Sequence, residues 1–199
     1  MITTIIFDLS EVYLKGLLGT EKILEPILKL PAKDIYHSFK GDHYIKFFHG
    51  EISEDEFWES VKNNANWDIS LSQLKNAVRS NFAEIEGTRE IIEKLKIKGY
   101  KLGLLSVHAK EWIEYLEKKF DYHKLFHSTM YSFEVGISKP DKKSYELIIE
   151  KLGAKPEECL FIDDHEKNII AAKGLGINAI HFKDSNQLIR DLNKFDIKI

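Results

Sequence analysis

The chain has 199 residues, enough for one sizeable domain with an insert, and its 43% hydrophobic and 31% charged residues are ordinary for a globular protein. Its net charge of −3 argues against a broad basic surface for nucleic acid. The one cysteine, Cys159, excludes an internal disulfide and a cysteine-built zinc site. Because it heads an apolar run, a buried structural thiol is favoured over a nucleophile.

The sequence contains no pattern of a membrane or export segment. No apolar stretch reaches the roughly 18–20 residues of a membrane span. The N-terminus runs directly into Ile5-Ile6-Phe7 without the basic region and cleavage site of a signal peptide. We therefore expect a cytoplasmic protein with neither a membrane nor a nucleic-acid partner.

The chain begins with a strand and continues into a helical region. Thr3–Asp8 is a short run rich in β-branched residues, which is typical of a buried strand. Residues 15–85 show helical periodicity throughout, with two capping-box patterns that begin at Ser53 and Ser70. The helices expected there are Thr20–Leu30, Ala32–Phe39, Asp42–Phe48, Ser53–Asn63 and Ser70–Phe82.

Strands and helices alternate through the rest of the chain. The later strands are expected at Tyr100–Ser106, Ser128–Tyr131, Cys159–Ile162 and Asn178–Phe182. The helices are expected at Gly87–Lys98, Ala109–Phe120, Asp141–Leu152, His165–Leu175 and Ser185–Leu192. Such alternation implies right-handed crossovers and a parallel sheet covered by helices on both faces.

The expected fold class is therefore α/β, a three-layer α/β/α Rossmann-like parallel sheet with an inserted α-helical cap. Residues 1–14 and 86–199 would form the core, and residues 15–85 the helical cap. An insert after the first strand would lie over the carboxyl ends of the strands, where open parallel sheets bind ligands.

Two of the expected strands lead directly into carboxylates. Asp8 follows the first strand, and Asp163 and Asp164 follow the apolar run that starts at Cys159. Because the carboxyl ends of parallel strands meet at one edge of the sheet, Asp8 and Asp164 are expected to face each other within reach of a single ion. Oxygen ligands suit Mg²⁺.

A hydroxyl and an ammonium complete the candidate site. Ser106 ends a third apolar run and would hold a phosphate oxygen, while Lys139 would reach inward as a counter-charge. Each group also has a purely structural interpretation. Asp8 would be a strand-end acid facing solvent, Asp164 an exposed helix N-cap, Ser106 a capping serine and Lys139 a solvated surface lysine. The order and spacing of the groups together favour the functional interpretation.

Four segments carry a resemblance to a known family. They are Phe7-Asp8-Leu9, Ser132–Asp141, Cys159–Asp164 with Asn168 and Ala171-Ala172 following, and Gly50–Trp58 in the insert. The first three resemble the core of the haloacid dehalogenase-like hydrolase superfamily. The fourth is similar to a cap segment of the subgroup that includes small sugar-phosphate phosphatases and the phosphatase domain of epoxide hydrolases.

The resemblance implies a Mg²⁺-dependent phosphatase or phosphotransferase acting on a small phosphorylated metabolite. Asp8 would attack phosphorus and form an aspartyl-phosphate. Mg²⁺ would be held by Asp8, Asp164 and the backbone carbonyl of Ser10, with Asp163 orienting the ligands. The phosphoryl oxygens would be bound by Ser106 and Lys139.

Two positions depart from the pattern of the family's phosphatases. Ser10 stands where they usually carry an aspartate that protonates the leaving oxygen and then activates water. A serine hydroxyl has no useful acidity near neutral pH, so turnover is expected to fall by about 10²–10⁴-fold unless another group substitutes. His108 and Glu11 are the nearest candidates, although His108 is better interpreted as a surface residue at a helix start. Val107 replaces the asparagine of many relatives.

These departures leave a second class of function open, a non-catalytic relative that binds a phosphorylated ligand or a protein partner. Dehalogenation ranks below phosphoryl chemistry because the family's dehalogenases use no metal, and Asp163-Asp164 would be out of place in one. The aromatic residues of the insert are expected to form bundle core rather than a substrate pocket; they include Tyr36, Tyr44, Phe47, Phe48, Phe57 and Trp58.

Overall fold

The structure is a computed structural model that describes residues 1–199, and its centre is one parallel sheet. The strands are β1 (Thr4–Phe7), β2 (Lys101–Ser106), β3 (Ser128–Tyr131), β4 (Cys159–Asp163) and β5 (Asn178–His181). They pair in the order β3-β2-β1-β4-β5, so the first strand of the chain lies in the middle. Every pairing is parallel.

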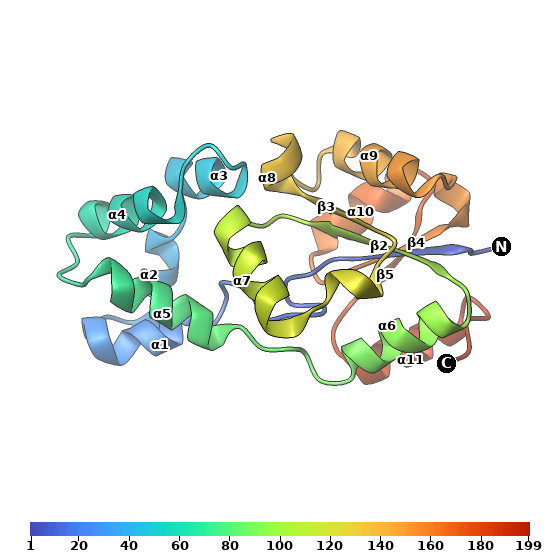
Figure 1. The fold of residues 1–199 in the computed structure, drawn as a ribbon, viewed down its shortest axis with the longest axis horizontal. Coiled ribbons are helices and arrows are strands. Elements are labelled where there is room, and N and C mark those ends of the chain that lie inside the picture. The colour runs from blue at the N-terminus through green and yellow to red at the C-terminus, as the bar shows by residue number, and fades with distance from the viewer.

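Helices cover both faces of the sheet (Figure 1). One face carries α6 (Thr88–Ile97), α7 (Lys110–Phe120) and α11 (Ser185–Asn193), and the other carries α9 (Lys142–Leu152) and α10 (Glu166–Gly174). Alternate side chains of β1 enter the two layers, because Ile5 and Phe7 belong to one apolar cluster and Ile6 to the other. The predicted three-layer α/β/α arrangement is confirmed.

Three short elements were not expected from the sequence. They are α8 (Ser132–Val135) and two turns of 3-10 helix, η1 (His123–Leu125) and η2 (Pro156–Glu158). The longer elements agree with the expected ones within two or three residues at each end. Elements of one turn are set by the contacts around them, because three or four residues are too few to display a hydrophobic period.

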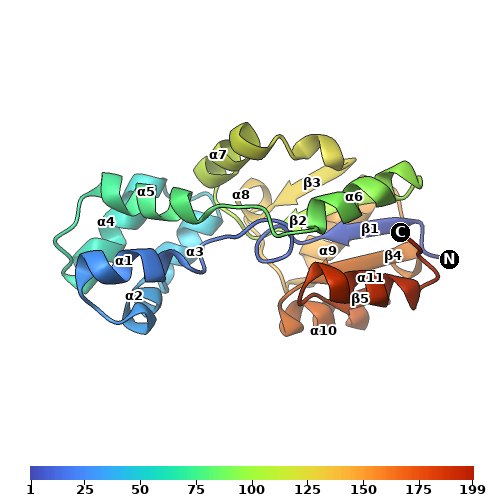
Figure 2. The same ribbon diagram turned by 90° about the horizontal axis from the view of Figure 1, so that it is seen from below.

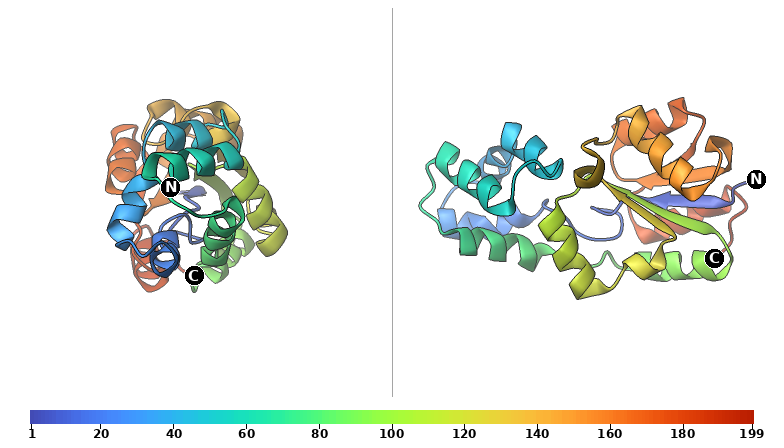
Figure 3. Two further views of the ribbon diagram at one scale, coloured as in Figure 1. Left: turned by 90° about the vertical axis from the view of Figure 1, so that its left-hand side faces the viewer. Right: turned by 45° about the horizontal axis from the view of Figure 1, so that its top comes forward.

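Five helices gather at one end of the molecule, beyond the carboxyl ends of the strands (Figures 1 and 2). They are α1 (Thr20–Leu28), α2 (Ala32–Ser38), α3 (Asp42–Phe48), α4 (Glu54–Ala65) and α5 (Leu71–Asn81). Seen along the long axis of the molecule, this helical group lies in front of the end of the sheet (Figure 3). Both expected capping boxes form, at Ser53 and at Ser70.

The aromatic side chains of the helical group are mostly its core, as predicted. Phe57 and Trp58 are fully buried, and Phe47 is 1% exposed. Tyr36 and Tyr44 are half-buried. The expectation for Cys159 is also confirmed, since the thiol is buried. None of the helices combines the length and the hydropathy that crossing a membrane requires.

Two segments connect the helical group to the sheet, and they are hydrogen-bonded to each other. The Lys15 N–H donates to the carbonyl of Ala83, and the Ile85 N–H donates to the carbonyl of Tyr13, each at 2.8 Å. The side chain of Asn81 donates to the carbonyl of Gly16 at 2.8 Å. The entry and exit of the insert are therefore paired rather than loose.

Candidate active site

The register of the sheet brings the sequence-predicted polar residues to one edge. Phe7 lies opposite Leu104 on one side and Ile162 on the other. The next residue after Phe7 is Asp8, which is therefore level with Asp163. Ser106 ends β2 on the other side of β1. All of these residues lie at the carboxyl end of the sheet, where parallel strands commonly bind ligands.

The three acids form a single cluster. One carboxylate oxygen from each of Asp8, Asp163 and Asp164 lies within 4.8 Å of the others, which confirms that Asp8 and Asp164 face each other. Asp8 is only 6% exposed, so its interpretation as a strand-end acid facing solvent is wrong. The alternative for Asp164 is also wrong, because the N-cap of α10 is His165.

Lys139 inserts its ammonium between two of these carboxylates. Its Nζ lies 2.9 Å from Oδ1 of Asp8 and donates to Oδ2 of Asp163 at 2.6 Å. The residue is 8% exposed, so it is not the solvated surface lysine of the alternative interpretation. Burial by itself would lower the pKa of Lys139, but the charges of Asp163 and Asp8 outweigh burial and hold this pKa above its usual value.

The cluster contains three acids and one ammonium, and the pKa values of Asp8 and Asp164 are raised. Burial raises the pKa of Asp8. The negative charges of Asp163 and Asp164 raise this pKa further, and the attraction of Lys139 only partly offsets these effects. Burial and the charge of Asp163 also raise the pKa of Asp164. Three ionised carboxylates with one ammonium leave two negative charges uncompensated. The donor set therefore fits a divalent cation bound by oxygen.

Asp163 is held in place by groups on the turn that follows β4. Its Oδ1 accepts a hydrogen bond from the His165 N–H at 2.8 Å, and both carboxylate oxygens lie 3.0 Å from Nδ2 of Asn168. The carbonyl of Asn168 accepts from the hydroxyl of Tyr145 on α9 at 3.1 Å. This carboxylate therefore has a fixed orientation within the acid cluster.

Ser106 has a buried hydroxyl without a hydrogen-bond partner. The residue is 1% exposed, and its Oγ contacts no donor or acceptor. It does not cap the following helix, because the N-cap of α7 is Ala109. An unsatisfied buried polar group costs about 1–3 kcal/mol. A bound anion at the end of β2 would satisfy this hydroxyl.

Ser10 and Glu11 lie in the tight loop that follows Asp8. A Cβ added at Gly16 would lie 2.9 Å from Oγ of Ser10, so a larger residue at position 16 would displace the Ser10 side chain. Oε1 of Glu11 accepts a hydrogen bond from the Gly16 N–H at 2.9 Å. Burial raises the pKa of Glu11, and the charge of Asp164 adds to the effect. Glu11 thus lies close to the acid cluster.

His108 is not the surface residue expected from the sequence. It is 1% exposed, and its ring packs among Phe48, Phe82 and Trp112. Burial lowers its pKa to about 4. The expectation was wrong because the apolar surroundings come from α3 and from the end of α5, which are distant in sequence.

Two features of the site escaped the sequence analysis. Burial raises the pKa of the Tyr44 phenol on α3 to about 12, with smaller contributions from Tyr36 and Asp8. Glu54 of α4 is 3% exposed and hydrogen-bonds Trp112 of α7. A glutamate in the first turn of a helix is ordinary in sequence, so no local signal could have revealed its burial.

Comparison with known proteins gives a family match over most of the chain. Residues 5–182 match the model of a family described as haloacid dehalogenase-like hydrolase. Flavin mononucleotide hydrolase 1 of Arabidopsis thaliana is 25% identical over 170 residues, which are 85% of this chain and 69% of that protein. A phosphorylated carbohydrates phosphatase of Thermotoga maritima is 34% identical over 56% of each chain. The match to the Thermotoga maritima phosphatase spans little more than half of that protein's length.

Solved structures share the fold. A HAD family enzyme from Bacteroides thetaiotaomicron, in complex with magnesium and inorganic phosphate, superposes with a TM-score of 0.78 at 24% identity, covering 92% of this chain and 96% of that one. A predicted HAD-like hydrolase from Porphyromonas gingivalis gives a TM-score of 0.79 at 23% identity, with full coverage of both chains. At this identity the likeness concerns the fold.

Proposed function

Since the chain belongs to the haloacid dehalogenase-like hydrolases, we propose that it hydrolyses or transfers the phosphoryl group of a small phosphate monoester, with Mg²⁺ as cofactor. The observation that carries the proposal is the cluster of buried Asp8 and Asp163 with half-buried Asp164, in which Lys139 pairs with the first two. Phosphoryl transfer depends mainly on positioning and charge neutralisation. A buried excess of carboxylates beside one ammonium, with an unpaired hydroxyl nearby, suits that chemistry.

Each residue of the cluster has a defined role in this proposal. Asp8 attacks phosphorus and forms an aspartyl-phosphate as the P–O bond to the alcohol breaks; the alkoxide leaves and takes a proton from water, and water later releases phosphate from Asp8. Mg²⁺ would be held by Asp8, Asp164 and the backbone carbonyl of Ser10, and it would supply positive charge for the phosphoryl oxygens. Asp163 orients the other groups through its bonds to Lys139 and Asn168.

The phosphoryl group is bound by the remaining two residues. Lys139 presents a buried ammonium 2.9 Å from the nucleophilic carboxylate, so it is positioned to neutralise phosphoryl oxygens beside Asp8. Ser106 offers the hydroxyl that has no partner within the protein. Ser106 ends β2, which neighbours β1, and Lys139 lies in the loop between α8 and α9.

Ser10 slows the hydrolytic step in this proposal. Its hydroxyl neither protonates the leaving oxygen nor activates water near neutral pH. Of the two candidate substitutes, Glu11 is better suited than His108. Glu11 is half-exposed beside the acid cluster and has a raised pKa, whereas His108 is sealed among aromatic rings and has a pKa of about 4.

The substrate class follows from the arrangement around the site. We propose that α1–α5, within residues 15–85, act as a cap over the core formed by residues 1–14 and 86–199. The reacting groups are almost fully buried, so the site suits a small phosphorylated metabolite. The names of two relatives, which specify flavin mononucleotide and phosphorylated carbohydrates, indicate esters worth testing.

A phosphate-release assay tests the proposal. The purified chain is incubated with Mg²⁺ and a panel that contains flavin mononucleotide, hexose phosphates, triose phosphates, p-nitrophenyl phosphate and acetyl phosphate. We expect release from at least one compound, and its loss in Asp8→Asn, because the amide is not a nucleophile. Silence across the panel, with no phosphoryl adduct by mass spectrometry after incubation with acetyl phosphate, would contradict the proposal.

The second candidate is a non-catalytic protein that binds a phosphorylated ligand or a protein partner. The observation that favours it is Ser10 at the position of the acid–base group, together with Val107 in the loop after Ser106. Calorimetry with the same compounds separates the two candidates. Binding without adduct or release would support the second, and turnover by the wild-type chain would exclude it.

A further inference from the structure

A tryptophan from the core lies inside the aromatic cluster of the helical group. Trp112 belongs to α7 and is fully buried. Its ring centroid lies 5.0 Å from that of Phe47, 5.6 Å from Phe48 and 5.9 Å from Phe82. Phe47 and Phe48 lie on α3, so one core side chain joins the two parts of the molecule.

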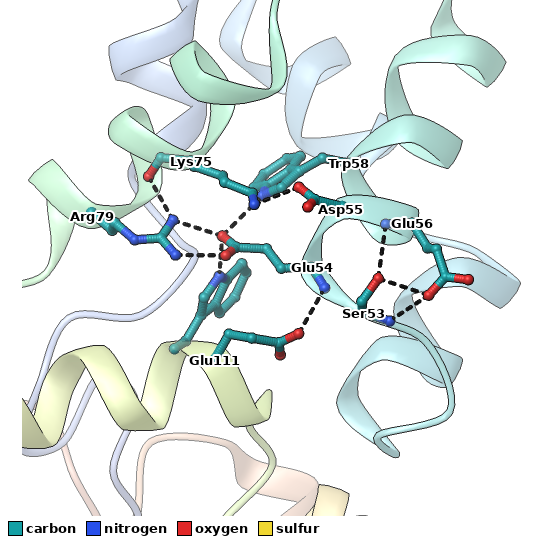
Figure 4. Close-up of polar contacts among 9 residues, drawn as sticks. Ser53, Glu54, Asp55, Glu56, Trp58, Lys75, Arg79 and Glu111 are labelled. Carbon is teal, nitrogen blue, oxygen red and sulfur yellow. Dashed lines mark hydrogen bonds and ion pairs between the residues drawn. The ribbon is translucent and has the colours of Figure 1, made fainter.

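The indole N–H of Trp112 donates to the buried carboxylate of Glu54. Figure 4 shows this carboxylate with its partner Arg79 and with Glu111. Oε1 of Glu54 accepts from Nε1 of Trp112 at 2.8 Å and from Nη1 of Arg79 at 2.8 Å, while Oε2 accepts from Nη2 of Arg79 at 2.5 Å. Trp58 donates to Oε1 at 3.3 Å. The Glu54 N–H donates to Oε1 of Glu111 on α7 at 3.0 Å.

The bonds of Glu54 come from both parts of the molecule. Arg79 and Trp58 lie on α5 and α4 of the helical group, whereas Trp112 and Glu111 lie on α7 of the core. A buried ion pair adds little net stability compared with apolar packing, because its desolvation is costly. Its directional bonds do restrict how the two parts can be oriented, since any other orientation leaves a buried charge unsatisfied.

The neighbouring acid on the same helix lacks this connection. Asp55 forms an ion pair with Lys75, so it also links α4 to α5 (Figure 4). The side chain of Asp55 is 60% exposed, and it makes no bond to α7. Glu54 and Asp55 therefore make the same link within the helical group, but only Glu54 extends it to the core.

Contacts of α3 connect the helical group, whose orientation Glu54 restricts, to the loops that contain Ser132 and Ser138. The carbonyl of Phe48 accepts a hydrogen bond from the hydroxyl of Ser132 at 2.6 Å. Nε2 of His49 lies 2.9 Å from the hydroxyl of Ser138, the residue before Lys139. Tyr44 stacks on Phe48 with ring centroids 4.3 Å apart. A shift of the helical group would move all of these contacts.

We propose that Glu54 is a positioning residue for the proposed reaction. Its carboxylate fixes the helical group to the core through Trp112 and Arg79, and α3 is thereby held where it contacts the leaving group of the substrate. The inference rests on the proposed function. It assigns no chemical step to Glu54, and Lys139 is held by Asp8 and Asp163 of the core, so the reaction at phosphorus is expected to change little when Glu54 is replaced.

The test compares Glu54→Gln with the matched control Asp55→Asn on two substrates. One is the best ester of the panel, whose leaving group reaches α3, and the other is acetyl phosphate, whose leaving group is minimal. Misplacement by about 1 Å can cost 10²-fold in rate. We expect Glu54→Gln to lower kcat/KM for the ester by about 10- to 100-fold, and to change it little for acetyl phosphate. Asp55→Asn should change neither.

A second variant removes only the donor on the core side. Trp112→Phe keeps an aromatic ring in the cluster but has no indole N–H. We expect the same selective loss of kcat/KM for the ester. In a double variant with Glu54→Gln, kcat/KM should fall by less than the product of the two single losses, because both substitutions disrupt the same bond between Trp112 and Glu54. This variant also tests the inference if Glu54→Gln folds poorly.

Amide hydrogen exchange supplies a readout that does not depend on turnover. We expect faster exchange in α3 for Glu54→Gln and unchanged exchange in β1. The inference would be overturned if kcat/KM fell equally for both substrates, or if α3 exchanged at the wild-type rate in both Glu54→Gln and Trp112→Phe. A wild-type chain that releases no phosphate from any compound of the panel and forms no phosphoryl adduct would instead overturn the proposed function, while the exchange data would still decide whether Glu54 positions α3.

Discussion

Lys139 explains how carboxylates can gather where water is excluded. Its ammonium contacts both Asp8 and Asp163 within 3 Å, and its side chain is 2% exposed. Isolated buried charges are costly, and pairing is the usual way in which proteins accommodate them. Because one ammonium cannot balance three acids, the donor set fits a further cation bound by oxygen. The same lysine that stabilises the folded site therefore leaves room for a metal.

In the proposed function, Ser10 is the residue expected to limit the rate of hydrolysis. We expect Ser10→Asp to raise steady-state phosphate release by about 10²–10⁴-fold, the usual contribution of general acid–base catalysis. The physical reason is that a carboxylate two residues after Asp8 can carry the proton that the serine hydroxyl cannot. Steady-state release from the best ester measures the gain.

The control for this prediction is Glu11→Gln in the wild-type and Ser10→Asp backgrounds. If Glu11 carries the proton in the wild-type chain, its removal should slow the wild type and have less effect once the aspartate is present. A Ser10→Asp variant with no gain in rate, at unchanged magnesium affinity, would show that the proton carrier is not what limits turnover.

At the scale of elements, the connection between β2 and α7 links the end of the sheet that carries Ser106 to the helical group. His108 lies in this connection, with its ring against Phe48 of α3 and Trp112 of α7. Its Nδ1 accepts a hydrogen bond from the Ala109 N–H at 3.1 Å. Protonation of His108 would place a charge among aromatic rings and remove this acceptor.

The stability of this junction should depend on pH. Burial lowers the pKa of His108 from 6.5 to about 4, so between these values the unfolded chain binds a proton that the folded chain does not. Stability that is present above pH 6.5 is therefore lost as the pH falls towards 4. The full loss is about 3 kcal/mol, measurable by urea unfolding across this range.

A non-titrating variant isolates the contribution of His108. His108→Gln should flatten the acid side of the stability profile, while His37→Gln, at an exposed position on α2, should keep the wild-type slope. A wild-type slope in His108→Gln would contradict the assignment, because the raised pKa values of Asp8 and Asp164 give a slope of the opposite sign.

At the scale of the whole molecule, the acid cluster couples metal binding to folding. We expect Mg²⁺ to raise the free energy of unfolding, by about 2.7 kcal/mol at a concentration one hundred times the dissociation constant. The reason is that the three carboxylates converge only in the folded chain. Thermal or urea unfolding with Mg²⁺ and with EDTA measures the difference.

Asp164→Asn provides the matched comparison. The pKa of Asp164 is raised by burial and by Asp163, so its ionised form is disfavoured in the metal-free chain. The variant should therefore be at least as stable as the wild type in EDTA, but it should gain much less from Mg²⁺. An undiminished gain would exclude Asp164 as a metal ligand.

The sequence by itself determined the elements and the order of the polar groups. Periodicity, the capping boxes at Ser53 and Ser70, and terminal glycines such as Gly153 are local signals, and the structure reproduces the helices and strands that they predict. A parallel sheet then brings its carboxyl ends to one edge, so the meeting of Asp8 with Asp164 also followed. The catalytic roles of these residues stay predictions.

Only the tertiary structure decided which partners the buried polar groups have. The position of Lys139 between Asp8 and Asp163, the burial of His108 and the bond from Glu54 to Trp112 all join residues that are far apart in sequence. Nothing in the neighbourhood of Glu54 distinguishes it from the exposed Asp55 beside it. Local sequence sets backbone conformation, whereas burial and pairing depend on how distant elements pack.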